Sequence, residues 1–272
     1  MLAGRVALVT GGGTGLGRAT ALELARCGAR AVICGRREEV LAEAVAEIEA
    51  LPGGGGGDWI AGDVREPEHA RRMIATVLER HGRLDLLVNN AGGQFFSPAE
   101  LIAAKGWRAV WRLNVGGMLN MSEAAHALAM GPAGSGAIVN VTLSPHHGMP
   151  GMAHSGAARA TVEALTRSLA ERWAPAGITV VAVAAGHFET EVLSKYPASV
   201  RAGASRTVPL QRLGDVAEHA WLVALLASPV GGAFNGSTVT LDGGRDNWFG
   251  PWPPPGLADE SGEVPVEERR AG

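Results

Sequence analysis

A cluster of glycines near the start of the chain restricts the fold more than any other feature of the sequence. Residues 5–10 form a short apolar run that predicts a buried strand, and helical spacing follows from Gly17 to Cys27. Between them stands Thr-Gly-Gly-Gly-Thr-Gly-Leu-Gly, residues 10–17. Glycines in such a turn let the backbone N–H groups at the start of a helix approach phosphate groups. The sequence therefore predicts a dinucleotide-binding turn, with a purely structural turn as the alternative.

The spacing of these glycines differs from the G-x-G-x-x-G pattern in every frame and reads T-G-x-x-x-G-x-G. Its position, directly after a strand and before a helix, supports a role in cofactor binding. The candidate cofactor contacts in the turn are Gly11, Gly13, Thr14, Gly15, Leu16 and Gly17.

Strand and helix patterns alternate along the rest of the chain. Further strands are expected at residues 31–34, 59–61, 84–89, 137–141, 178–183 and 238–241, and helices at 37–50, 67–80, 98–130, 153–174 and 215–227. The helix at 98–130 has a break near Gly106 as an alternative. Strict alternation implies a parallel sheet with helices on both faces. We expect an α/β fold, a single-domain Rossmann-type doubly wound sheet of about seven strands, over residues 1–245.

The remaining residues, 246–272, are rich in proline and tryptophan and read as an extended C-terminal tail, with a lid over an active site as the alternative. The formal net charge is -3, and no long run of one sign occurs, which argues against nucleic-acid or polybasic membrane partners. Two cysteines exclude a disulfide framework and disfavour a zinc cluster, so we expect no metal site. Without a membrane-length apolar run or a signal pattern, a cytoplasmic location and a small-molecule substrate are expected.

Four further motifs stand at the ends of expected strands or in a helix. They are Gly62-Asp63-Val64, Asn89-Asn90-Ala91-Gly92, Leu113-Asn114-Val115 and Leu241-Asp242-Gly243-Gly244. With the glycine spacing, they resemble the short-chain dehydrogenase/reductase family over about residues 4–245. The resemblance implies a nicotinamide cofactor and a homo-oligomer, a tetramer or dimer. The cofactor contacts that it implies beyond the first turn are Asp63, Val64, Asn90, Ala91, Gly92, Gly186 and Thr190.

The end of the second strand bears on the choice between the two nicotinamide dinucleotides. Gly35 stands where a carboxylate would favour NAD, and Arg36 and Arg37 follow it. Because a guanidinium group pairs well with a phosphate, we expect NADPH rather than NADH. The alternative is that these arginines only begin a solvated helix.

The family's usual Ser, Tyr and Lys are absent from their positions in this sequence. Arg159 stands at the Lys position, Ser155 at the Tyr position with His154 before it, and Thr142, or Ser144 with a gap, at the Ser position. The single tyrosine, Tyr196, lies in the variable region after the sixth strand. Serine has no pKa near neutrality and arginine stays protonated, so ordinary carbonyl chemistry is not favoured.

A narrower resemblance agrees with these departures. The runs at residues 89–100, 105–107, 154–159 and 242–245 resemble the peroxisomal trans-2-enoyl-CoA reductase branch, which is similar to the 2,4-dienoyl-CoA reductases. That branch implies reduction of a C=C bond, in which charge develops on a thioester oxygen and a proton reaches the α-carbon separately. The expected catalytic residues are Asn114, Thr142, Ser144, His154, Ser155 and Arg159, and the expected substrate contacts are Gln94, Phe95, His146, His147 and Tyr196.

Each of these residues also has a plainer interpretation, as a strand cap, a packing residue or a solvated loop residue. His154 is a candidate for supplying the proton, directly or through water, since its pKa lies near neutrality, but the sequence does not identify the donor. Three functions are therefore compared: an NADPH-dependent enoyl reductase as the first, a carbonyl reductase with a substitute acid, and a cofactor-binding isomerase or cyclase without redox chemistry.

Overall fold

Seven strands, each parallel to its neighbours, form one sheet in the order β3-β2-β1-β4-β5-β6-β7. The computed structural model describes residues 1–146, 148, 151–191, 193, 201 and 203–247. Its strands are β1 (Val6–Thr10), β2 (Arg30–Gly35), β3 (Gly57–Ala61), β4 (Leu86–Asn89), β5 (Gly136–Leu143), β6 (Ile178–Ala185) and β7 (Thr238–Leu241). The strand order reverses between β1 and β4, and ligands bind at such a reversal in open parallel sheets. The prediction of a doubly wound sheet of about seven strands is confirmed.

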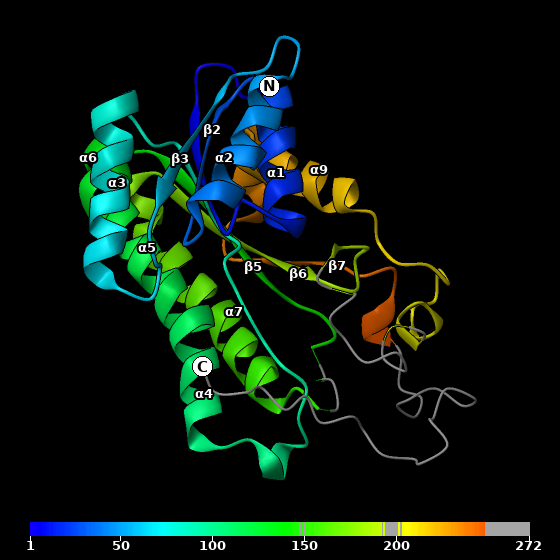
Figure 1. Cartoon of the computed structure of the whole chain (residues 1–272). Coiled ribbons are helices and arrows are strands. Elements are labelled where there is room, and N and C mark those ends of the chain that lie inside the picture. The colour runs from blue at the N-terminus through cyan, green and yellow to red at the C-terminus, as the bar shows by residue number, and fades with distance from the viewer. Residues whose placement is uncertain (147, 149–150, 192, 194–200, 202, 248–272) are drawn as a thin grey trace.

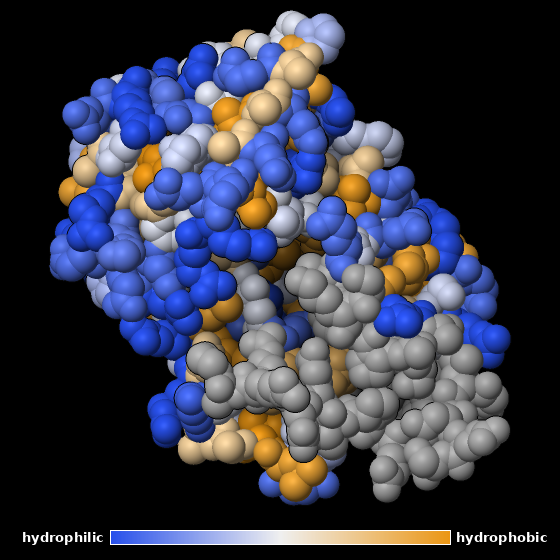
Figure 2. Space-filling view, viewed as in Figure 1, coloured by the Kyte–Doolittle hydropathy of each residue, from blue (hydrophilic) through white to orange (hydrophobic). Residues whose placement is uncertain are grey.

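Helices cover both faces of the sheet (Figure 1). On one face lie α1 (Gly15–Arg26), α2 (Glu38–Glu49) and α9 (Val216–Ala227), and on the other α3 (Pro67–His81), α5 (Gly117–Ala125) and α7 (Ala153–Trp173). Hydrophilic residues dominate the surface over α2 and α3 in Figure 2, so these helices turn polar faces to solvent.

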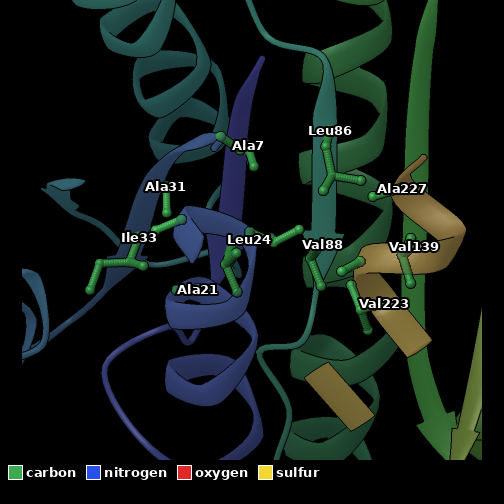
Figure 3. Packing of buried hydrophobic residues seen from close by; sticks show 14 of the residues in the cluster. Ala7, Ala21, Leu24, Ala31, Ile33, Leu86, Val88, Val139, Val223 and Ala227 are labelled. Carbon is green, nitrogen blue, oxygen red and sulfur yellow. The ribbon is translucent and has the colours of Figure 1, made fainter. Parts of the chain in front are cut away.

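Both faces of the central strands are buried, which explains their continuous apolar runs. Along β1, Ala7 and Val9 belong to one core and Val6 and Leu8 to the other. Figure 3 shows the first core, in which α1 and α9 pack side by side against the sheet.

The expected helix at residues 98–130 begins later than predicted. Pro98 is extended and is followed only by a 3-10 turn, η1 (Ala99–Leu101), and the long helix starts at Ala104. It continues through α4 (Ala104–Trp111), the π-helical segment η2 (Arg112–Gly116), α5, a second π-helical segment η3 (His126–Met130) and α6 (Gly131–Ala133). The break expected as an alternative near Gly106 occurs at Ile102 and Ala103, and Gly106 itself lies inside the first turns of α4.

Strands β5 and β6 run two residues further than predicted. Their ladder pairs Thr142 with Ala184 and Leu143 with Ala185, and the backbone N–H of Ser144 continues it to Ala185 O at 3.0 Å. This extension carries residues 142–144 out to the carboxyl edge of the sheet, where the ends of β4 and β7 also lie. Strand β3 likewise begins at Gly57, two residues before the predicted start at residue 59.

Within the described residues, no helix combines the length and the apolar composition needed to cross a lipid bilayer.

Candidate active site

The first βα turn can take glycine alone at its most crowded positions. A Cβ added at Gly17 would overlap Gly11 O and Asn90 Nδ2, and one added at Gly12 would overlap the Ile33 side chain. Gly11 and Gly15 adopt φ values of +65 and +54, which glycine accepts without strain. Glycine at these positions therefore lets the turn pack directly against β2 and the residue that follows β4.

Helix α1 starts with backbone donors that no side chain caps. Its N-cap, Thr14, makes no side-chain hydrogen bond, and its first turn holds no acidic residue. Such N–H groups and the positive end of the helix dipole suit a pyrophosphate. Gly13 faces Val40, and Leu16 packs on the core, so these two candidates offer only backbone atoms.

The turn is tied to the end of β4 by a residue that sequence reasoning did not select. The hydroxyl oxygen of Thr10 accepts hydrogen bonds from the backbone N–H groups of Asn90 and Ala91, at 3.0 and 2.9 Å. In return, Asn90 Nδ2 donates to Thr10 O at 2.9 Å. Asn90 and Ala91 thus hold the shape of the cofactor turn.

Three arginines gather where β2 and β3 end. Arg36 and Arg37 are exposed, which leaves their guanidinium groups accessible to a phosphate. The three atoms nearest to a Cβ added at Gly35 all belong to Leu41. Arg65, which sequence reasoning missed, binds both carboxylate oxygens of Asp63 and lowers the pKa of that group to about 2. Neighbouring Val64 accepts a hydrogen bond from Asn120 Nδ2 at its carbonyl oxygen.

One face of α7 borders the ends of β4 and β5. Ser155 and Arg159 lie four residues apart on this face, and both are turned inwards. Arg159 Nη1 donates to Val141 O at 2.8 Å, and its guanidinium lies so close to Gly92 that a Cβ there would overlap it. A fixed positive charge therefore stands beside Gly92, three residues after the end of β4.

Ser155 meets a residue from the opposite side of the site. Its hydroxyl donates to Gln94 Oε1 at 2.8 Å, and the serine is fully buried. The structure thus brings together a candidate catalytic residue and a candidate substrate residue that are 61 positions apart.

His154 lies in apolar surroundings instead. Its ring centroid is 4.2 Å from that of Phe95 and 6.1 Å from that of Trp107. The side chain is 1% exposed, and neither ring nitrogen has a hydrogen-bond partner. Burial lowers the pKa of His154, so the imidazole is neutral near pH 7.

Asn114 uses its whole amide to fix the backbone. Its Nδ2 donates to Gly93 O and Val110 O, both at 2.8 Å, while its Oδ1 accepts from the N–H of Gly93 at 3.2 Å. The π-helical segment η2 places it there, and such segments are frequent at functional sites. Asn114 therefore shapes the loop that carries Gly92 and Gly93.

Thr142, Ser144 and His146 each face a carboxylate that was not selected from the sequence. Thr142 donates to Glu163 Oε1 at 3.1 Å, and Ser144 donates to Asp242 Oδ2. His146 Nδ1 lies 2.6 Å from Asp246 Oδ2. Glu163 stands four residues after Arg159, and this spacing was the only signal that could have found it.

The loop after β6 reaches back to the cofactor turn. The Thr190 side chain would be 3.9 Å from a Cβ at Gly15, and Gly186 packs so tightly on Asp242 that no Cβ fits. Two expected substrate contacts, His147 and Tyr196, lie outside the described residues.

Comparison with known proteins agrees with this geometry. The sequence model of the family described as "Enoyl-(Acyl carrier protein) reductase" matches residues 11–246. A probable 2,4-dienoyl-CoA reductase of Bacillus subtilis is 37% identical over 254 residues, 92% of this chain and 98% of that protein. A peroxisomal 2,4-dienoyl-CoA reductase of Danio rerio is 35% identical, over 90% of this chain and 82% of that protein.

The solved structure of a citronellol catabolism dehydrogenase (AtuB) from Pseudomonas aeruginosa superposes with a TM-score of 0.81 at 38% identity, covering 90% of this chain and 96% of that one. The uncapped glycine turn, the strand order and these matches lead to one assignment: the chain belongs to the short-chain dehydrogenase/reductase family and is an NAD(P)-dependent oxidoreductase.

Proposed function

We propose that the protein reduces the carbon–carbon double bond of an enoyl thioester with NADPH. The observation that carries the proposal is the inner face of α7, which presents Ser155 and Arg159 beside the end of β4. Neither side chain can act as an acid near neutral pH, because a serine hydroxyl does not ionise there and arginine keeps its proton. This pair suits a reaction in which no strong acid must reach a carbonyl oxygen.

The cofactor fits the first βα turn by its phosphates. The uncapped N–H groups of α1 would hold the pyrophosphate, and Arg159 would hold the nicotinamide ribose. When bound, the nicotinamide would supply the hydride that the β-carbon of the alkene receives, and a proton from solvent would complete the reduction at the α-carbon.

The chain's own groups then stabilise the charge that develops on the thioester oxygen. Arg159 provides a positive field that Val141 O holds in place, and the Ser155–Gln94 pair provides a preorganised polar contact across the site. Phe95 and Trp107 form an apolar wall with the neutral His154, which excludes water and suits a hydrocarbon chain. The dienoyl-CoA reductase relatives support the thioester class.

Preference for NADPH is part of the proposal. Arg36 and Arg37 are exposed at the end of β2, no carboxylate stands at Gly35, and the nearby Asp63 is neutralised by Arg65. The local charge at this edge is therefore positive, which favours a 2′-phosphate.

Steady-state assays with NADPH test the reaction. Matched panels of 2-enoyl-CoA esters, 2,4-dienoyl-CoA esters and ketones are compared, with products identified by mass spectrometry. Saturated or singly reduced thioesters are expected. Turnover of ketones alone would establish the carbonyl reductase instead, and no cofactor oxidation with any substrate would favour the isomerase or cyclase.

We also propose that the protein assembles as a homotetramer or dimer. Trp221 and Leu225 stand four residues apart on α9 and are 60% and 40% exposed, and nearby Val230 is 63% exposed. Apolar side chains gathered in this way support an interface between copies. Light scattering at micromolar concentration tests this, and a monomer would end the claim. The C-terminal tail expected over residues 246–272 starts within the described part of the chain, where Asp246 contacts His146, and its residues 248–272 lie outside that part.

A further inference from the structure

Two carboxylates from distant segments hold the imidazole of His146. Its Nδ1 is 2.6 Å from Asp246 Oδ2, and its backbone N–H donates to Asp246 Oδ1 at 2.6 Å. Its Nε2 is 3.3 Å from Glu163 Oε1. Both nitrogens of an imidazolium are donors, so only the protonated ring satisfies both carboxylates. We call His146, Glu163, Asp242 and Asp246 the His146 cluster.

Asp242 adds a second connection to the same loop. It accepts the Ser144 hydroxyl and, within its own segment, the N–H groups of Gly244 and Asp246 at 2.9 and 2.8 Å. The loop after β5 is therefore fastened to the segment after β7 at two points, although about 100 residues separate them in the chain.

Glu163 links the cluster to the catalytic helix. It is 9% exposed and accepts the Thr142 hydroxyl at 3.1 Å. One helical turn earlier on the same face, Arg159 binds Val141 O at 2.8 Å. The Thr142 hydroxyl also contacts Arg159 O at 3.3 Å, so three hydrogen bonds join the end of β5 to α7, and one of them depends on the Glu163 carboxylate.

We propose that the His146 imidazolium is a positioning residue: by binding Asp246 and Glu163 together, it fixes the end of β5 against α7 and so sets the place of Arg159 in the active site. The kinetic part of this inference rests on the proposed function. His146 acts through Glu163, which accepts the Thr142 hydroxyl at the end of β5.

The charges around His146 give this role a pH dependence. Burial opposes protonation, but the carboxylates of Asp246, Glu163 and Asp242 outweigh it and raise the pKa of His146 above its usual value. Arg167 faces Glu163 from α7, and Arg245 lies near Asp242 and Asp246. Burial raises the pKa of Glu163, whereas His146, the Thr142 hydroxyl and Arg167 act in the opposite direction.

The stabilisation that His146 contributes to the fold depends on pH. A histidine whose folded-state pKa is raised stabilises the fold fully below its ordinary pKa of about 6.5, and it loses that contribution as the pH rises through the raised value. The positioning effect is therefore present in mild acid and lost on the alkaline side.

Variants at position 146 test the kinetic part. Profiles of kcat and KM against pH are measured with NADPH and an enoyl-CoA ester for wild type, His146→Gln and His146→Lys. We expect wild-type kcat to fall on the alkaline side, His146→Gln to be about tenfold lower in mild acid without that fall, and His146→Lys to keep activity where wild type has lost it. His81→Gln, which breaks the 2.9 Å pair with Asp58 elsewhere, is the control and should follow wild type. If all four proteins share one profile, the proposal is wrong.

A titration independent of turnover tests the cluster itself. Histidine resonances followed by NMR should give His146 a pKa above 6.5 in wild type, and Asp246→Asn and Glu163→Gln should each lower it. Amide exchange at residues 142–146 should also become faster in Asp246→Asn. An ordinary His146 pKa, unmoved by either variant, overturns the inference. A wild-type protein that does not turn over enoyl thioesters, yet shows these shifts, would instead refute only the proposed function.

Discussion

The two ends of the active site are held together by different physical means. At the nucleotide end, the turn at residues 10–17 is fixed by uncharged hydrogen bonds to the end of β4 and by positions where a Cβ does not fit. At the substrate end, side chains from β5, α7 and the segment after β7 meet through charges and hydroxyl groups. The nucleotide end should therefore respond to added side-chain volume, and the substrate end to changes of charge and pH. Substitutions of each kind can distinguish the two ends.

The largest change in stability and cofactor affinity is expected at Gly17, where there is no space for a side chain. A methyl group in Gly17→Ala would overlap Gly11 O, which belongs to the cofactor turn, and Asn90 Nδ2, which binds that turn from the end of β4. We expect a loss of about 3 kcal/mol in the free energy of unfolding, and cofactor affinity at least tenfold weaker. Urea unfolding and cofactor titration measure both quantities.

Gly116→Ala is the matched control, because nothing lies within 4 Å of its added Cβ and the residue is helical. It should be neutral or gain up to about 1 kcal/mol. If Gly17→Ala behaves like this control, the crowding assigned to the turn is absent.

The next largest change, in kcat/KM and cofactor binding, is expected when the positive charge of Arg159 is removed. Arg159→Ala removes a buried charge-assisted contact to Val141 O, and a loss of about 1.5–3 kcal/mol, roughly tenfold to a hundredfold in kcat/KM, should follow. Cofactor binding should weaken as well, and Arg159→Lys should retain much of both, since lysine also carries a charge. The exposed Arg172 on the same helix provides the control Arg172→Ala. Parameters within about twofold of wild type in Arg159→Ala would refute the role.

These two ends also differ in how far sequence could predict them. The glycine turn is local: strand, turn and helix lie within about 25 residues, and backbone geometry demands glycine there, so its place and ligand class follow from residues 5–27 alone. The sheet was predictable for the same reason, because buried parallel strands are continuous apolar runs.

The partners at the substrate end could not be predicted in this way. Thr142, Ser144 and His146 were expected to face substrate, but each meets a carboxylate 21 to 100 positions away. No pattern in one sequence states such pairings, since they depend on where β5 and β7 end. The two extra residues of β5 and the late start of α4 were missed because strand pairing and the extended conformation of Pro98 overrode local preference.

A smaller effect should distinguish the two cofactors at the nucleotide end. Wild type is expected to bind NADPH roughly tenfold to a hundredfold more tightly than NADH, because a charge-assisted contact contributes about 1.5–3 kcal/mol. Arg36→Ala should weaken NADPH binding about tenfold and leave NADH binding unchanged, whereas Arg26→Ala, at the far end of α1, should change neither. Equal dissociation constants for the two cofactors in wild type would contradict the assignment.

The smallest effect is expected at His154, which belongs to the apolar wall with Phe95 and Trp107. This wall differs from the charged His146 cluster, although His146 is only eight residues earlier in the chain. Its ring nitrogens are buried without partners between Phe95 and Trp107, and an unpaired buried polar group costs free energy. His154→Leu should therefore leave the free energy of unfolding unchanged or raise it by about 1 kcal/mol. Since burial lowers the pKa of His154, the neutral ring is a poor acid, and kcat should stay within about threefold of wild type. A folded His154→Leu protein with turnover more than tenfold lower would restore His154 as the candidate proton donor, and the wall would then be part of the chemistry.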